Sequence, residues 1–316
     1  MDMVSTQHAT VDEIVRKPEG EIATWPAPFE ATPPENRLDM PVQSFRRWKG
    51  AERRAPAAPS AWRTPWLARL FVFGGAWALT AYGAWEMYNV VSVSRTTFLQ
   101  YVLLLLFTVN FSWIALAFTS AILGFVTLLF GLLKSPRAET LSQKTVVVMP
   151  IYNESTARTF AALAAIRESV EATGLGEHFD YFIVSDTTNP DIWVAEERAF
   201  LALRQRLGPE ARIYYRHRPK NHHRKAGNIA DFVTRWGGHY AHMVVLDADS
   251  LMTGTCIVRL AAAMEADPDA GIIQSLPLII NRNTFFARLQ QFAARVYGPV
   301  IATGLAVWSG RDGNYW

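Results

Sequence analysis

Two aspartates separated by one small residue, Asp247-Ala248-Asp249, form the sharpest chemical motif in the sequence. They follow residues 242–246, an apolar run with the composition of a buried strand. Two carboxylates at the end of a strand can share one hard cation with a diphosphate, and Mg²⁺ or Mn²⁺ accepts such oxygen ligands. We therefore predict that Asp247 and Asp249 bind a divalent cation. The alternative is an acidic turn in which Asp249 or Ser250 caps the next helix.

A second motif, Lys225-Ala226-Gly227-Asn228, opens a predicted helix over residues 225–236. Its small residues allow a close approach of the backbone, and the start of a helix carries a partial positive charge that favours phosphate. We predict that Lys225 contacts phosphate.

The residues before this helix are strongly basic. A nucleic-acid patch is one interpretation, and a solvated loop is the alternative, favoured for the outermost cations. His222 and His223 could ligate a metal, but adjacent histidines flanked by cations are more often solvated or face phosphate. The cations are Arg212, Arg216, Arg218, Lys220, Arg224 and Lys225.

Two other predicted strands also end in polar residues. The first ends in Pro150-Ile151-Tyr152-Asn153-Glu154, and the second ends in Ser185-Asp186. Asp186 could accept hydrogen bonds from a nucleoside base or ribose, as acidic residues at strand ends do. A turn or a cap is the alternative for Asp186, and the same ambiguity holds for Asn153 and Glu154.

These motifs need a sheet to bring them together, and residues 144–316 have the pattern of one. Short apolar strands alternate with helical segments, which predicts a parallel sheet covered by helices on both faces. Ligands of such sheets bind beyond the carboxyl ends of the strands. The predicted strands are 145–149, 181–184, 212–215, 242–246 and 271–274, and the predicted helices are 156–173, 191–207, 225–236 and 255–266.

Residues 66–133 have a different composition. Residues 66–88 are apolar apart from Arg69 and Glu86, and residues 98–133 contain no ionisable side chain other than Tyr101. About 20 apolar residues cross a bilayer, so we predict two transmembrane helices rather than a pair of buried core helices. Basic residues flank the pair on its outer sides, whereas the connection carries only Arg95. The positive-inside rule then places both flanking segments in the cytoplasm.

The first 60 residues are rich in proline and have no apolar period, so we predict a disordered cytoplasmic tail.

The whole chain has 316 residues and a formal net charge of +3, too slight a balance to indicate nucleic acid by itself. A single cysteine, Cys256, excludes a disulfide framework and any multi-cysteine zinc site. The segment from Trp308 to Trp316 could lie at an acceptor or membrane surface, or could serve packing.

Taken together, the motifs resemble the family 2 processive glycosyltransferases, which include cellulose synthase and hyaluronan synthase. Residues 147–154, Ser185-Asp186, Lys225 to Asn228 and residues 245–250 carry the resemblance, which extends over nearly the whole chain. Within the family, the proline-rich tail and residues 307–316 most resemble bacterial membrane enzymes that make osmoregulated periplasmic glucans. The resemblance implies an α/β fold, a nucleotide-sugar-binding domain of the GT-A type with a mostly parallel sheet, preceded by a two-helix transmembrane hairpin.

The resemblance also implies roles for individual residues. Asp186 would hold the uridine of UDP-glucose, Lys225 would approach the diphosphate, Asp247 would contact the nucleotide and Asp249 would coordinate Mg²⁺ or Mn²⁺. The partners implied are UDP-glucose, a growing glucan acceptor, the lipid bilayer of the bacterial inner membrane and periplasmic glucan-processing proteins, without nucleic acid. The full set of predicted nucleotide-sugar-binding residues is Pro150, Asn153, Glu154, Asp186, Lys225, Asn228 and Asp247.

The family also has a downstream aspartate that acts as general base and a Gln-x-x-Arg-Trp signature, neither of which occurs before Trp316. The sequence therefore predicts a glucosyltransferase present as its N-terminal portion. A membrane-tethered nucleotide-sugar-binding module without turnover, a synthase of the cellulose or hyaluronan type, and a metal-dependent enzyme of phosphate chemistry are the alternatives.

Overall fold

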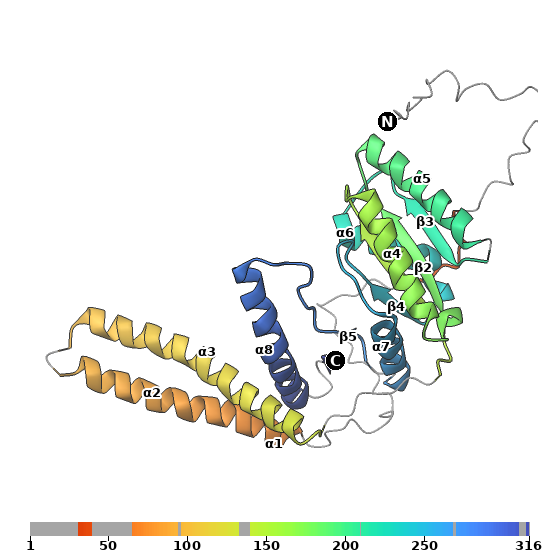
Figure 1. The fold of residues 1–316 in the computed structure, drawn as a ribbon. Helices are drawn as coiled ribbons and strands as arrows, with labels where there is room; N and C mark the ends of the chain where they lie inside the picture. The colour runs from red at the N-terminus through yellow and green to blue at the C-terminus, as the bar shows by residue number, and fades with distance from the viewer. Residues whose placement is uncertain are drawn as a thin grey trace, which may run out of the picture.

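A computed structural model describes residues 31–39, 65–93, 96–132, 140–208, 210–267, 270–309 and 314–315. Figure 1 shows an α/β unit at one end and a pair of long helices at the other, with a third helix beside the pair. The α/β unit runs from β1 to α7 in chain order.

A parallel sheet forms the centre of the α/β unit. Within the described residues it has four strands, in the order β3-β2-β1-β4, and all neighbouring strands pair in parallel. The predicted parallel sheet is therefore confirmed, and the carboxyl ends of its strands meet at one edge. The strands are β1 (Thr145–Ile151), β2 (Phe179–Ser185), β3 (Ile213–His217) and β4 (His242–Val245).

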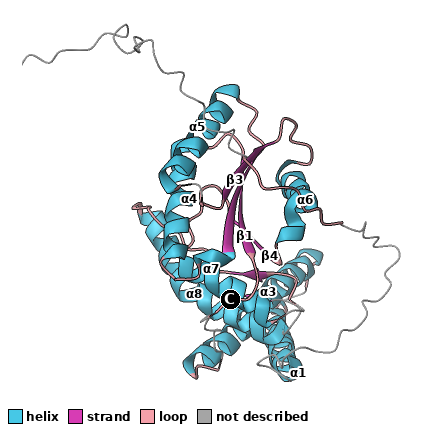
Figure 2. Cartoon of the chain, turned by 90° about the vertical axis from the view of Figure 1, so that its right-hand side faces the viewer, coloured by secondary structure: helices cyan, strands magenta, loops and turns pink. Residues whose placement is uncertain are grey.

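Helices cover both faces of this sheet. Figure 2 shows α4 and α5 on one side of the strands and α6 on the other. The residues of β1 alternate between the two cores: Val147 packs with side chains of α4, α5 and α7, whereas Val146 and Val148 pack with Trp236 of α6. This alternation follows from the two-residue period of a strand. The helices are α4 (Thr156–Glu171), α5 (Pro190–Leu207), α6 (Arg224–Trp236) and α7 (Gly254–Ala266).

The fifth predicted strand does not join this sheet. β5 (Ile273–Gln274) pairs in parallel with β6 (Asn314–Tyr315) and forms a separate two-stranded sheet. The expectation of a fifth strand in the main sheet was therefore wrong. The apolar run of residues 271–274 identified a strand but carried no information about its partner, which lies 41 residues further along the chain.

Two long apolar helices precede the α/β unit. The first covers Pro65–Val91 and consists of α1 (Pro65–Arg69), a π-helical segment (Leu70–Gly74) and α2 (Gly75–Val91). The second is α3 (Phe98–Leu129). Both are long and apolar enough to cross a membrane, and only 22% and 11% of their most apolar windows are buried. This low burial argues against the alternative of buried core helices. Most of the basic residues that set the predicted orientation lie outside the described residues.

A further helix, α8 (Phe285–Ser309), packs along α3 and α1. The sequence pattern had not indicated this helix. Arg69 of α1 donates hydrogen bonds to the last carbonyls of α8, those of Trp308 (2.8 Å) and Ser309 (2.9 Å). The Trp308 indole N–H donates to Ser120 Oγ at 3.2 Å, so Trp308 serves packing. Residues 310–313 and 316 lie outside the described residues.

Part of the segment predicted as a disordered tail is docked on the α/β unit. Residues 31–39 run along β3 and the end of α6, where Tyr215 N–H donates to the Ala31 carbonyl at 2.9 Å. The prediction of disorder through residue 60 therefore fails for residues 31–39. The rest of residues 1–60 lies outside the described residues.

Candidate nucleotide-sugar site

A cavity of about 1430 Å³ opens at the carboxyl edge of the sheet. Residues that follow all four strands line it, as the alternating pattern predicted. Of the predicted site residues, the cavity brings together Pro150, Glu154, Asp186, Lys225, Asn228, Asp247 and Asp249. Asn153 does not line it.

Asp247 and Asp249 follow β4 and both are exposed. Asp247 forms an ion pair with Lys225 of α6, which joins the two sharpest motifs of the sequence. Among the described residues, no three His, Cys, Asp or Glu side chains form a group that could hold a metal. Two exposed carboxylates can bind Mg²⁺ or Mn²⁺ when a diphosphate and water supply the remaining oxygen ligands. The donor set therefore fits such a cation.

The turn before α6 brings the chain close to this pair. His223 and Arg224 adopt positive φ angles of 58° and 49°, which non-glycine residues rarely adopt. A β-carbon on Gly227 would overlap the carbonyl oxygen of His222, so only glycine fits beneath the turn. The predicted close backbone approach in the Lys225-Ala226-Gly227-Asn228 motif is thus present, and His222 and His223 line the cavity from this turn.

Asp186 follows β2 and is buried, with both carboxylate oxygens taken by Arg218. Arg218 Nε donates to Oδ1 at 2.8 Å and Nη2 donates to Oδ2 at 2.6 Å. A bidentate pair of this kind is a strong, oriented interaction. A solvated loop was one interpretation of the basic stretch that contains Arg218, but the Arg218 side chain is only 16% exposed and sets the position of Asp186.

Asn228 is buried and its polar groups are engaged within the protein. Its Oδ1 accepts from Arg216 at 2.7 Å, and its Nδ2 donates to the carbonyl of Val184 at 2.9 Å. Arg216 also forms an ion pair with Asp231 at 2.9 Å. Burial lowers the pKa of Arg216 to about 10, so it stays charged at neutral pH. These contacts fix the start of α6 against β2 and β3, beside the cavity.

Glu196 of α5 was not among the residues predicted from the sequence. It is 1% exposed, and its carboxylate accepts hydrogen bonds from Ser185 Oγ (2.7 Å), Thr187 Oγ1 (2.6 Å) and Tyr215 OH (3.0 Å). Ser185 and Thr187 flank Asp186, so Glu196 holds the turn that presents this aspartate. Its position seven residues into a helix rich in charged residues gave no signal of burial.

The end of β1 is held by the turn after β2. Asn153 has a φ of 58°, its N–H donates to Thr187 Oγ1 at 3.0 Å, and its Oδ1 accepts from Asn189 N–H at 3.2 Å. Asn153 therefore joins the two turns and stands outside the cavity. Glu154 lies at the cavity, where burial raises the pKa of its carboxyl above the usual range.

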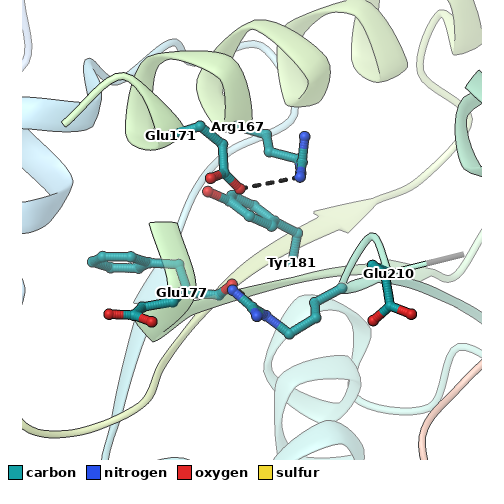
Figure 3. A pocket seen from close by; sticks show the side chains of 7 residues that line it. Arg167, Glu171, Glu177, Tyr181 and Glu210 are labelled. Atoms are coloured by element: carbon teal, nitrogen blue, oxygen red, sulfur yellow. Dashed lines mark hydrogen bonds and ion pairs between the residues drawn. The ribbon is translucent and has the colours of Figure 1, made fainter. Parts of the chain in front are cut away.

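A smaller cavity of about 240 Å³ lies beside the amino ends of the strands, away from the predicted site residues. Figure 3 shows Glu171 and Arg167 of α4 above the Tyr181 ring, with Glu177 and Glu210 on the opposite side. Arg212, the first cation of the basic stretch, also lines this cavity and pairs with Asp180 at 2.9 Å. Arg212 therefore lies far from the Asp247–Lys225 pair and takes no part in that site.

A parallel sheet with a cavity lined by charged residues at its carboxyl edge defines an α/β protein of the class that binds ligands there. The model of the family "Glycosyl transferase family 2" matches residues 146–310, which include the main sheet apart from Thr145, the first residue of β1, and every residue of the cavity. The chain belongs to that family.

Curated relatives extend the similarity beyond the family region. The chain is 49% identical over 292 residues to glucans biosynthesis glucosyltransferase H of Rhodopseudomonas palustris (strain BisA53). It is 50% identical over 292 residues to the protein of the same name from Shewanella sp. (strain ANA-3). Each alignment covers 90% of this chain and 40% of the relative. The chain thus spans about 40% of the length of these relatives.

Proposed function

We propose that this chain supplies the nucleotide-sugar site of a membrane glucosyltransferase that uses UDP-glucose and Mg²⁺ or Mn²⁺ to extend a glucan backbone. The cavity at the carboxyl edge of the sheet is the observation that carries the proposal, because it gathers Asp247, Asp249, Lys225 and Asp186. The name of the relatives, glucans biosynthesis glucosyltransferase H, supports glucose as the sugar and a glucan as the product.

Each charged group has a task in donor binding. Asp247 and Asp249 hold the cation, which neutralises charge on the departing diphosphate. Lys225 exchanges Asp247 for a phosphate oxygen and adds a second positive charge at the start of α6. Asp186, oriented by Arg218, accepts a hydrogen bond from the nucleoside.

The transfer inverts the configuration at the sugar. An acceptor hydroxyl oxygen forms a bond to C1 of glucose while the bond from C1 to the β-phosphate oxygen breaks. That electron pair leaves with UDP, and a base takes the hydroxyl proton. We do not expect Asp186, Asp247 or Asp249 to be this base, since Asp186 is paired with Arg218 and the other two are assigned to the cation.

We further propose that the two apolar helices anchor the chain in a bacterial inner membrane, with the α/β unit in the cytoplasm. The lengths of Pro65–Val91 and Phe98–Leu129 support a membrane anchor. The basic residues of positions 46–63 and 134–144 support the orientation. The product would then be elongated at the cytoplasmic face, and periplasmic glucan-processing proteins would act on it later.

Metal-dependent binding of UDP tests the site. We expect UDP to bind the full chain in the presence of Mn²⁺ or Mg²⁺, and to bind at least about tenfold more weakly in EDTA or in Asp249→Asn, because a metal bridge to the diphosphate is lost. Isothermal titration calorimetry measures this. Glu197→Gln removes one charge from an exposed position on α5 and should bind UDP like the wild type.

Equal UDP binding with and without metal would refute the metal assignment. Incorporation of glucose from labelled UDP-glucose, measured on the chain with an added glucan acceptor, separates an enzyme from a module that binds without turnover. Binding without incorporation would favour the binding module for these 316 residues.

A further inference from the structure

Residues 31–38 form an extended segment, here called the strap, that lies on the edge of the α/β unit. The strap begins at β3, the edge strand of the main sheet, where the Ala31 carbonyl accepts the hydrogen bond from Tyr215 N–H. Ala31 also packs against the larger of the two apolar cores. An edge strand presents unpaired backbone groups, and the strap satisfies one of them, the Tyr215 N–H.

From β3 the strap runs to the carboxyl end of α6. The Trp236 indole N–H donates to the Pro33 carbonyl at 3.0 Å, and His239 Nε2 meets the Pro34 carbonyl at 2.9 Å. Arg235 Nε donates to Glu35 Oε1 at 2.7 Å. The strap is thus held at consecutive positions, largely through its own backbone carbonyls.

The strap continues over the turn that follows α6. Gly238 N–H donates to the Asn36 carbonyl at 3.0 Å, and Leu38 N–H donates to the Thr234 carbonyl at 3.2 Å. A β-carbon on Gly238 would lie 2.7 Å from Asn36 Oδ1 and 2.9 Å from its carbonyl oxygen. The nearest neighbours of Gly238 are strap atoms, so this glycine makes room for the strap.

The strap contacts α6, and this helix also carries Lys225 of the proposed donor site. α6 starts beside Lys225 and Asn228 at the cavity and ends at Trp236 under the strap. Its 13 residues form one continuous helix about 20 Å long. A restraint at the carboxyl end of α6 therefore limits rotation and sliding at its amino end.

We propose that the strap is a positioning element for the donor site: its docking on α6 holds Lys225 and the start of this helix in the geometry that receives the diphosphate. This inference rests on the proposed function for its ligand, although the contact between strap and helix does not. The amino-terminal segment thereby sets the affinity of the site for a nucleoside diphosphate without touching it. Undocking exposes both the strap and the edge of β3.

One substitution in the full chain and one shortened chain test the proposal. Gly238→Ala pushes the strap away with one methyl group, and a chain that begins at Met40 lacks the strap altogether. Gly271→Ala is the matched control, because a β-carbon there meets nothing within 4 Å. We expect faster deuterium uptake over residues 224–239 in both variants, and UDP binding with Mn²⁺ that is about 3- to 10-fold weaker, since only a fraction of the molecules is binding-competent.

Unchanged deuterium uptake in α6 of the chain beginning at Met40 would overturn the proposal, as would faster uptake with unchanged UDP affinity. If the wild-type chain binds no UDP with metal, the proposed function fails and the effect on affinity fails with it. The uptake measurement still decides whether the strap restrains α6. Equal effects of Gly238→Ala and Gly271→Ala would also overturn the proposal.

Discussion

Glu196→Ala is expected to lower the free energy of unfolding by about 3–4 kcal/mol, because it leaves three buried hydroxyl donors without an acceptor. Ser185, Thr187 and Tyr215 all donate to this carboxylate, at 2.6–3.0 Å. Glu196 is 1% exposed, so its carboxylate is the acceptor that these hydroxyls have in place of bulk water. Chemical denaturation of the full chain in detergent, followed by the fluorescence of its tryptophans, measures the change.

The same substitution should weaken UDP binding at temperatures where the variant is folded. Glu196 holds the turn on both sides of Asp186, so its loss lets this aspartate and Arg218 shift together. Glu196→Gln keeps the shape and one acceptor, and hydroxyl groups can rotate to accept from its amide. We therefore expect intermediate losses of stability and affinity. Glu197→Ala, the exposed neighbour, should change neither quantity.

A change in unfolding free energy of less than about 1 kcal/mol for Glu196→Ala would contradict the view that the three hydroxyl groups depend on this carboxylate as their acceptor. A large loss of stability with unchanged UDP affinity would show that Glu196 supports the fold without positioning Asp186. The two measurements thus separate a structural role from a positioning role.

Local patterns were enough to predict the sheet and the residues gathered at its edge. Runs such as 145–149 and 242–246 are short, apolar and followed by polar residues, and parallel strands place those polar residues together. The observed strand ends differ from the predicted ends by up to two residues. For example, β2 starts at Phe179, whereas the prediction started it at Tyr181. The convergence of Lys225 and Asp247 follows from the same rule.

Contacts between distant parts of the chain were outside the reach of these patterns. Glu196 has the appearance of a surface residue of a charged helix, and its burial depends on hydroxyls from β2 and β3. The strap is rich in proline and makes its contacts through backbone carbonyls, which leave no trace in hydrophobic periodicity. The partner of β5 and the packing of α8 likewise depend on segments that are distant in sequence.

The second large effect is expected where α3 and α8 cross. A β-carbon on Gly124 would overlap the carbonyl oxygen of Val300, and one on Gly304 would overlap the carbonyl oxygen of Ser120. The two backbones are therefore in direct contact, as at helix crossings built on pairs of small residues four positions apart. Ser120 and Gly124 form such a pair on α3, and Trp308 bonds to Ser120 within the same crossing.

Gly124→Ala and Gly304→Ala should each destabilise this crossing by about 3 kcal/mol, the upper end for overpacking, because backbone atoms cannot rotate away as side chains can. The double variant should lose less than the sum, since helices already separated by one methyl group accommodate the second. Gly74→Ala is the control: its β-carbon would meet Leu70 at 3.7 Å, an ordinary contact, and alanine favours a helix. Thermal unfolding in detergent and deuterium uptake over residues 285–309 measure the effect.

If the three alanine variants unfold at the same temperature and α8 exchanges equally in all of them, the two helices do not pack at these glycines. Strictly additive losses would instead show that the glycines act in separate contacts.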